Sequence, residues 1–189
     1  MKTIRTFLAI PLPTNIAGAA GKLIVSTRFD GDGIKWVPVD NLHLTLKFLG
    51  EVDNVETPDV CTALESICEP MQPFDLNFLG TGGLPDAERA RVLTVRIDDP
   101  SGQLVQLAAN IDDRFAEMGY KREPRDYRPH LTLGRARANA RRANEDVVKR
   151  WLEHAGKPLG EMRVDHVQVV GSFLEKRGPV YNIMDTIDL

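Results

Sequence analysis

Two short segments of the chain have the same sequence, His-Leu-Thr-Leu, at residues 43–46 and 130–133. Side chains alternate between the two faces of a strand, so the histidine and the threonine of each segment share one face and the leucines share the other. If the two strands lie side by side, two imidazoles and two hydroxyls meet in one small volume: those of His43, Thr45, His130 and Thr132. Such a set can accept a proton, donate a proton and bind an oxyanion, as acid–base chemistry at a phosphate requires.

An imidazole titrates near pH ~6.5, so one neutral and one protonated histidine can coexist near neutrality. In-line attack on phosphorus places the base and the acid on opposite sides, which suits histidines on separate strands. The threonine hydroxyls can donate hydrogen bonds to the phosphate oxygens. From the residues alone, either His43 or His130 can be the acid. The other two histidines, His154 and His166, have no threonine two residues later, and we expect them to be structural.

The residues that follow the two motifs differ. Alternation places Lys47 on the face of the first histidine. There it could add a positive charge to the site, or it could be an ordinary exposed lysine of a strand. Arg135 lies five residues after the second histidine, so strict alternation places it on the leucine face. A bulge or a strong twist at Gly134 could return Arg135 to the histidine face. The corresponding position in the first copy is Phe48.

The charge of the chain is modest overall and uneven locally. A net charge of −3 and a pI near 5.8 argue against a general nucleic-acid coat. Residues 119–142 nevertheless carry eight lysines and arginines against two acidic residues, either as a solvated face or as a rim that attracts phosphate. Three aromatic residues, Trp36, Tyr127 and Tyr181, either belong to the core and its rim or stack on a nucleobase.

The sequence predicts a soluble cytoplasmic protein that does not enter a membrane. The apolar run near the N-terminus is short and interrupted by Arg5 and prolines, which favours a first strand over a signal peptide. No segment has the length of a membrane span. Cys61 and Cys68 lie seven residues apart in an expected helix, too far for a disulfide, which indicates free thiols in a reducing compartment.

Hydrophobic periodicity and turn residues predict one α+β unit over residues 1–189. We expect strands at residues 6–10, 34–37, 42–49, 74–78, 91–97, 130–136, 164–173 and 180–187. We expect helices at residues 14–28, 56–68, 101–118 and 144–153. A glycine-rich loop is predicted around residues 80–85 and a turn at residues 176–179. Most strands can pair antiparallel, in two similar lobes that each hold one motif strand, with helices on the outer sides.

The sequence resembles the two-histidine (2H) phosphoesterases, and among them the LigT-like RNA 2′,3′-cyclic phosphodiesterases. The segments that carry the resemblance are residues 41–50 and 128–135, together with residues 7–10, Trp36, residues 91–93 and Tyr181. This resemblance implies a bilobal, pseudo-duplicated fold with a V-shaped central cleft. It also implies hydrolysis of an RNA or nucleoside 2′,3′-cyclic phosphate to the 2′-phosphomonoester, with no metal and no cofactor.

The resemblance further implies a role for each site residue. His43 would protonate the departing 3′ oxygen as the acid, and His130 would be the base. Thr45, Thr132 and Arg135 would bind the substrate. The implied partners are RNA ends or nucleotides with a 2′,3′-cyclic phosphate, including tRNA fragments, and the protein would act as a monomer.

Three alternatives remain open from the sequence. Some relatives join or cleave 2′–5′ linkages between tRNA halves or in 2′–5′ oligonucleotides. A non-catalytic protein that binds RNA ends would hold a terminal phosphate without turnover, although arginine or lysine would serve binding as well as two histidines. A metal hydrolase is disfavoured, because no acidic or cysteine partner lies at ligand spacing beside either motif.

Overall fold

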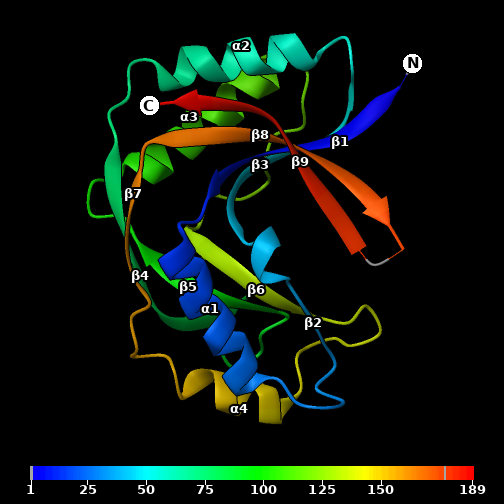
Figure 1. Cartoon of the computed structure of the whole chain (residues 1–189), viewed down its shortest axis with the longest axis vertical. Coiled ribbons are helices and arrows are strands. Elements are labelled where there is room, and N and C mark those ends of the chain that lie inside the picture. Colours follow the sequence, from blue (N-terminus) through cyan, green and yellow to red (C-terminus); the bar gives the residue numbers. More distant parts are fainter. Residues whose placement is uncertain (1, 177) are drawn as a thin grey trace.

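The structure is a computed structural model that describes residues 2–176 and 178–189. The described residues form two antiparallel sheets and four α-helices (Figure 1). The four-stranded sheet has the order β3-β1-β8-β9, and the five-stranded sheet has the order β2-β6-β5-β4-β7. The α+β class and the mostly antiparallel sheets expected from the sequence are confirmed. Residue 177, within the expected turn at residues 176–179, lies outside the described residues.

The four-stranded sheet consists of β1 (Thr3–Pro11), β3 (His43–Asp53), β8 (His166–Glu175) and β9 (Gly178–Asp188). The five-stranded sheet consists of β2 (Ile34–Trp36), β4 (Phe74–Leu84), β5 (Val92–Asp98), β6 (His130–Ala136) and β7 (Gly160–Val164). The helices are α1 (Thr14–Thr27), α2 (Thr57–Cys68), α3 (Gln103–Glu117) and α4 (Glu145–Leu152), with a 3₁₀ turn η1 at Val39–Asn41. Each sheet therefore contains one motif strand, β3 or β6.

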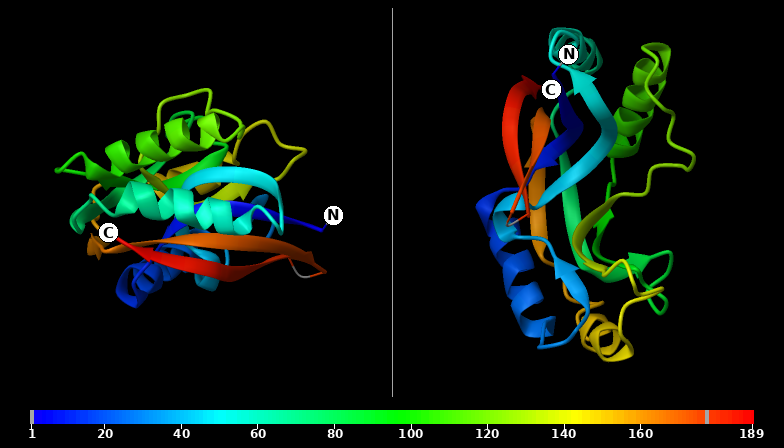
Figure 2. Two further views of the ribbon diagram at one scale, coloured as in Figure 1. Left: turned by 90° about the horizontal axis from the view of Figure 1, so that it is seen from above. Right: turned by 90° about the vertical axis from the view of Figure 1, so that its right-hand side faces the viewer.

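The chain crosses between the two sheets. Helices α2 and α3 contact each other and pack against the four-stranded sheet through β9 and β3. Helices α1 and α4 contact each other and pack against the five-stranded sheet through β7 and β4. Helix α1 follows β1 but covers the other sheet, and α3 follows β5 but covers the other sheet, as Figures 1 and 2 show. Each sheet is therefore covered by one helix that follows one of its own strands and one that follows a strand of the other sheet.

The leucines of both motifs face one continuous core. Leu44, Leu46, Leu131 and Leu133 are all buried in the same cluster, together with the apolar stripe of α3. Burial of each leucine contributes about 1.5–3 kcal/mol relative to an exposed side chain. The histidine and threonine that alternate with these leucines are thereby held on the opposite face of each strand.

The structure has one strand that the sequence did not predict, β7 (Gly160–Val164), and strands β3 and β4 are longer than expected. Strand β3 passes through Gly50, which has φ +80°, and ends at Asp53. The predicted loop around residues 80–85 is mostly the second half of β4. A Cβ at Gly80 would lie 1.9 Å from the carbonyl oxygen of Ala155, so glycine is required there by the close approach of another chain segment.

Candidate active site

The two motif histidines are anchored in the same way. Both are half-buried and begin their strands. Nδ1 of His43 lies 2.8 Å from the carbonyl oxygen of Asn41, and Nδ1 of His130 lies 2.6 Å from the carbonyl oxygen of Arg128. A carbonyl can only accept a hydrogen bond, so Nδ1 carries the hydrogen in each ring. Nε2 of each histidine is thereby left to accept a proton when neutral or to donate one when protonated.

A bulge follows the threonine in each motif strand. The pairing of β1 with β3 shifts between Thr45 and Lys47, and the pairing of β5 with β6 shifts between Thr132 and Gly134. An extra residue on one strand inverts the alternation beyond it. The second bulge turns Arg135 toward the face of the motif histidine, where it is exposed. The bulge that the sequence allowed at Gly134 is therefore present.

The first bulge turns Lys47 away from the histidine face, so both sequence interpretations of this residue are wrong. Lys47 is only 2% exposed. Its Nζ donates hydrogen bonds to Oδ1 of Asp112 and, at 2.8 Å, to the carbonyl oxygen of Lys121. Phe48 occupies the histidine face instead, with its ring centroid 5.8 Å from that of Phe7.

The surroundings of position 134 leave room only for glycine. A Cβ at Gly134 would lie 2.7 Å from Cγ2 of Ile34 and 2.9 Å from Cε3 of Trp36. Real Cβ atoms do not approach other heavy atoms so closely, because protein interiors are packed at crystal density. The lysine found at the corresponding position of β3 could not be accommodated in β6.

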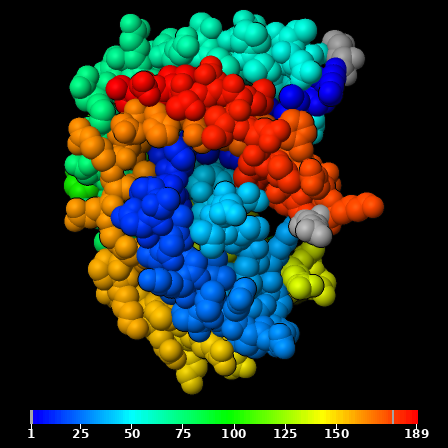
Figure 3. All heavy atoms as spheres, in the orientation of Figure 1, coloured from blue at the N-terminus to red at the C-terminus, as the bar shows by residue number. Residues whose placement is uncertain are grey.

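Aromatic rings surround the first histidine. The Phe7 ring stacks on His43 with a centroid distance of 4.8 Å, and Tyr181 presents its edge at 5.5 Å. Nδ2 of Asn41 donates to the carbonyl oxygen of Pro179 at 3.0 Å, which brings the start of β9 beside the start of β3. In Figure 3 the surface is hollowed between the β8–β9 hairpin, orange to red, and the light-blue segment around η1.

We use the name motif cleft for the space beside the histidine faces of β3 and β6. Burial raises the pKa of Tyr181, and the guanidinium charges of Arg5 and Arg135 act against this shift. The charge of Arg135 also acts on His130. The charge of Arg135 in the five-stranded sheet therefore acts on both Tyr181 and His130, and the Tyr181 ring lies 5.5 Å from that of His43. Strands β3 and β6 also contact each other directly.

Both histidines are biased toward the neutral form. Burial lowers the pKa of His43 and outweighs the hydrogen bond to the Asn41 carbonyl, which acts in the opposite direction. Burial also lowers the pKa of His130, against its hydrogen bond to the Arg128 carbonyl. The positive charges of Arg135 and Arg128 lower the pKa of His130 further. The two imidazoles therefore have matching anchors but different electrostatic surroundings.

Comparison with the sequences of known proteins identifies the family of the chain. Residues 18–172 match the model of the 2′-5′ RNA ligase superfamily. The chain belongs to this superfamily. It is 32% identical over 182 residues to an RNA 2′,3′-cyclic phosphodiesterase of Methanocaldococcus jannaschii, covering 96% of this chain and 98% of that protein. The resemblance drawn from the two motifs is confirmed.

Solved structures of similar proteins have the same fold. A Thermus thermophilus protein superposes with a TM-score of 0.80 at 27% identity, covering 98% of each chain. The E. coli LigT structure in complex with 3′-AMP also has a TM-score of 0.80, at 25% identity, covering 100% of this chain and 99% of that chain. The nucleotide in the second structure belongs to that protein.

The three candidate stacking residues lie in different surroundings. Trp36 packs on Trp151 at 6.0 Å and donates to Oδ2 of Asp32 at 2.7 Å, so it belongs to the packing of the five-stranded lobe. Tyr127 donates to the carbonyl oxygen of Thr45 at 3.1 Å. Tyr181 alone among the three touches a motif histidine in the described residues.

The remaining histidines have other partners. His154 lies 3.4 Å from Oγ of Ser26 at the end of α1, and His166 lies 2.6 Å from a carboxylate oxygen of Asp165. Two contributors to the site were missed from the sequence, Phe7 and Asn41. Phe7 could have been placed on the histidine side of its strand, because it alternates with the core residue Leu8. The role of Asn41 is visible only in the folded backbone.

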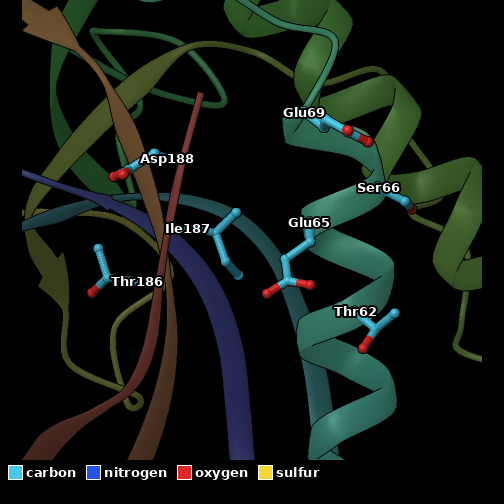
Figure 4. A pocket seen from close by; sticks show the side chains of 7 residues that line it. All are labelled: Thr62, Glu65, Ser66, Glu69, Thr186, Ile187 and Asp188. Atoms are coloured by element: carbon cyan, nitrogen blue, oxygen red, sulfur yellow. The ribbon is translucent and has the colours of Figure 1, made fainter.

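The cavity shown in Figure 4 lies apart from the motif cleft. It measures about 580 Å³ and lies between α2 and β9, where Glu65 points toward the strand. Its titratable lining residues are all acidic: Glu65, Glu69 and Asp188. A phosphodiester anion would be repelled there, so this cavity does not compete with the motif cleft as a phosphate site.

Among residues 2–176 and 178–189, no three side chains of histidine, cysteine, aspartate or glutamate are grouped in a way that could hold a metal ion. In the same ranges, no helix has both the length and the apolar character needed to cross a membrane.

Proposed function

We propose that this protein is an RNA 2′,3′-cyclic phosphodiesterase that hydrolyses the cyclic phosphate to a 2′-phosphomonoester without a metal. The observation that carries the proposal is the paired arrangement of His43 and His130. Each has Nδ1 bonded to the carbonyl two residues earlier, and each has a threonine on the same strand face. The name of the Methanocaldococcus jannaschii relative supports the same reaction.

The proposed reaction is a single in-line displacement at phosphorus. His130 takes a proton from the attacking water at Nε2 while the water oxygen bonds to phosphorus. The bond from phosphorus to the ribose 3′ oxygen breaks, and His43 gives its Nε2 proton to that oxygen. The products are a 2′-phosphate and a 3′ hydroxyl. Thr45 and Thr132 donate hydrogen bonds to the nonbridging oxygens, and the charge of Arg135 stabilises them.

The surroundings of the two histidines support this assignment of acid and base. The charges of Arg135 and Arg128 disfavour a protonated His130, as a general base requires. His43 lies between the aromatic rings of Phe7 and Tyr181 instead. A bound phosphodiester anion raises the pKa of a nearby imidazole, which would protonate His43 in the complex.

The proposed substrate is an RNA end or a nucleotide with a 2′,3′-cyclic phosphate, including tRNA fragments. We further propose that the protein acts in the cytoplasm as a monomer. Its two cysteines, Cys61 and Cys68, are free, which is consistent with a reducing compartment. The basic residues Arg128 and Arg135 beside the second motif provide charge complementary to a phosphate.

The product distinguishes this function from its alternatives. A 2′,3′-cyclic nucleotide is incubated with enzyme that has been treated with a chelator, and the 2′ and 3′ monophosphates are separated by chromatography. We expect the 2′ isomer. A predominant 3′ isomer would reverse the substrate orientation, and unchanged substrate would favour a protein that only binds RNA ends.

A second activity is suggested by the family that the chain matches, the 2′-5′ RNA ligase superfamily. Joining of RNA halves that end in a 2′,3′-cyclic phosphate and a 5′ hydroxyl would use the same two histidines, with the 5′ hydroxyl in place of water. Gel analysis of such paired halves tests this activity separately from hydrolysis.

A further inference from the structure

The segment that leads into the second motif strand contains no helix or strand. It consists of residues 118–129, between the end of α3 and His130. Residues 118–120 donate backbone hydrogen bonds to α3, whereas the path of the rest of the segment depends on side-chain contacts. The position of His130 relative to His43 therefore depends on what holds this segment in place.

The segment is held to the other motif strand by Lys47. The ammonium group of Lys47 donates to Oδ1 of Asp112 on α3 and to the carbonyl oxygen of Lys121 within the segment. Oδ1 of Asp112 also accepts a hydrogen bond from the backbone N–H of Glu123 at 3.0 Å. Burial disfavours ionisation of Asp112, but the bonds from Lys47 and Glu123 outweigh it and hold the pKa of this carboxyl below its usual range.

A second contact reaches the first motif itself. The hydroxyl of Tyr127 donates to the carbonyl oxygen of Thr45 at 3.1 Å. Burial raises the pKa of Tyr127, so the hydroxyl keeps its proton and remains a donor throughout the neutral pH range. Tyr127 lies three residues before His130, and Thr45 lies two residues after His43.

We propose that Lys47, Asp112 and Tyr127 form a clasp that fixes the separation of the two motif histidines. They are positioning residues, and the proposal rests on the function proposed above. A well-packed apolar side chain in place of a buried ion pair is often at least as stable, so stability alone does not account for a buried lysine. Directional hydrogen bonds from one ammonium group fix both α3 and the segment against β3.

The main test compares Lys47→Met with a matched control. Methionine has a similar length and removes the charge and the donors. We expect kcat for a 2′,3′-cyclic nucleotide to fall by about 10-fold to 100-fold, because misplacement by about 1 Å costs on that order. KM should stay within about threefold, because only the transition state needs both histidines aligned. Lys47→Arg, which keeps a charged donor, should recover part of kcat.

The control is Thr81→Val. Thr81 is buried on β4, which β5 separates from the second motif strand, and it donates to the carbonyl oxygen of Trp151 at 2.6 Å. This variant should lose stability without a change in kcat. All rates are measured at a temperature where circular dichroism shows each variant to be folded. If Lys47→Met does not fold, Tyr127→Phe keeps the packing, removes only the bond to Thr45, and should lower kcat by about threefold or more.

Hydrogen exchange tests the clasp without relying on activity. The amides of residues 120–123 and 125–128 should exchange faster in Lys47→Met and as in wild type in Thr81→Val. Unchanged exchange in the first variant, or a kcat equal to that of Thr81→Val, would overturn the clasp. Absence of histidine-dependent turnover in the wild type would instead refute the proposed function, and the exchange measurement would still decide whether the clasp exists.

Discussion

Substitution of each motif histidine by glutamine tests the division into acid and base. Both Nδ1 atoms are bonded to backbone carbonyls, so Nε2 is the group that each ring can use for proton transfer. Glutamine can place an amide near that position but cannot transfer a proton at neutral pH. His43→Gln and His130→Gln should each lower kcat on a 2′,3′-cyclic nucleotide by about 10²-fold to 10⁴-fold. This loss corresponds to about 2.7–5.4 kcal/mol of transition-state stabilisation.

A substrate with an activated leaving group then separates the two roles. The p-nitrophenolate released from bis(p-nitrophenyl) phosphate departs without protonation and therefore needs no acid. On this substrate His43→Gln should lose less than about tenfold, whereas His130→Gln should keep its full loss, because water must still be deprotonated. His154→Gln, which alters a histidine bonded near Ser26, is the control and should match wild type.

The outcomes on the two substrates have distinct meanings. A reversed pattern on the activated substrate would exchange the acid and the base. Near wild-type rates for both variants on the cyclic nucleotide would refute acid–base catalysis by this pair. Equal losses on both substrates would show that His43 contributes binding or packing and not a proton.

Two further predictions concern the residues after the second motif. Gly134→Ala should lower the free energy of unfolding by about 1–3 kcal/mol through overpacking, and thermal denaturation should show a midpoint about 2–12 °C lower. Gly18→Ala, which adds a methyl group into open space on α1, should not lower it, so equal midpoints would contradict the close approach. Arg135→Gln should shift the acidic limb of the kcat/KM profile to higher pH, because the charge of Arg135 adds to burial in lowering the pKa of His130 and the base must be neutral. Arg89→Gln, at an exposed ion pair, is the control, and an unmoved limb in Arg135→Gln would show that this charge does not act on His130.

The sequence predicted the parts of the site that depend on strand periodicity. The leucines at residues 44, 46, 131 and 133 lie in the core, so the polar residues between them lie on the opposite face. Period-two alternation is a local property of an extended chain and can be read from spacing alone. The fold class was predicted from the pattern of strands and helices, and the family from the resemblance carried by the two motifs and their flanking segments.

The orientation of Lys47 could not be predicted from the sequence. Its direction depends on a bulge, and a bulge depends on how β3 pairs with β1, which strict alternation ignores. The glycines at the end of β4 were misinterpreted for a related reason. Gly80 is required by contact with Ala155, which is distant in the sequence. The carbonyls of Asn41 and Arg128 that anchor the histidines have no residue-type signal at all.

The proposed division into acid and base requires the surroundings of the two motifs to differ, because the motifs themselves are identical in sequence. Both copies have the same bulge and the same histidine anchor, so the backbone does not distinguish them. The residue at the bulge is a buried lysine in one copy and a glycine in the other. The next residue, which returns to the histidine face, is Phe48 in the first copy and Arg135 in the second. Burial lowers the pKa of both imidazoles, and the guanidinium charges of Arg135 and Arg128 lower the pKa of His130 further. In the proposed mechanism, this added positive charge makes His130 the better proton acceptor of the two.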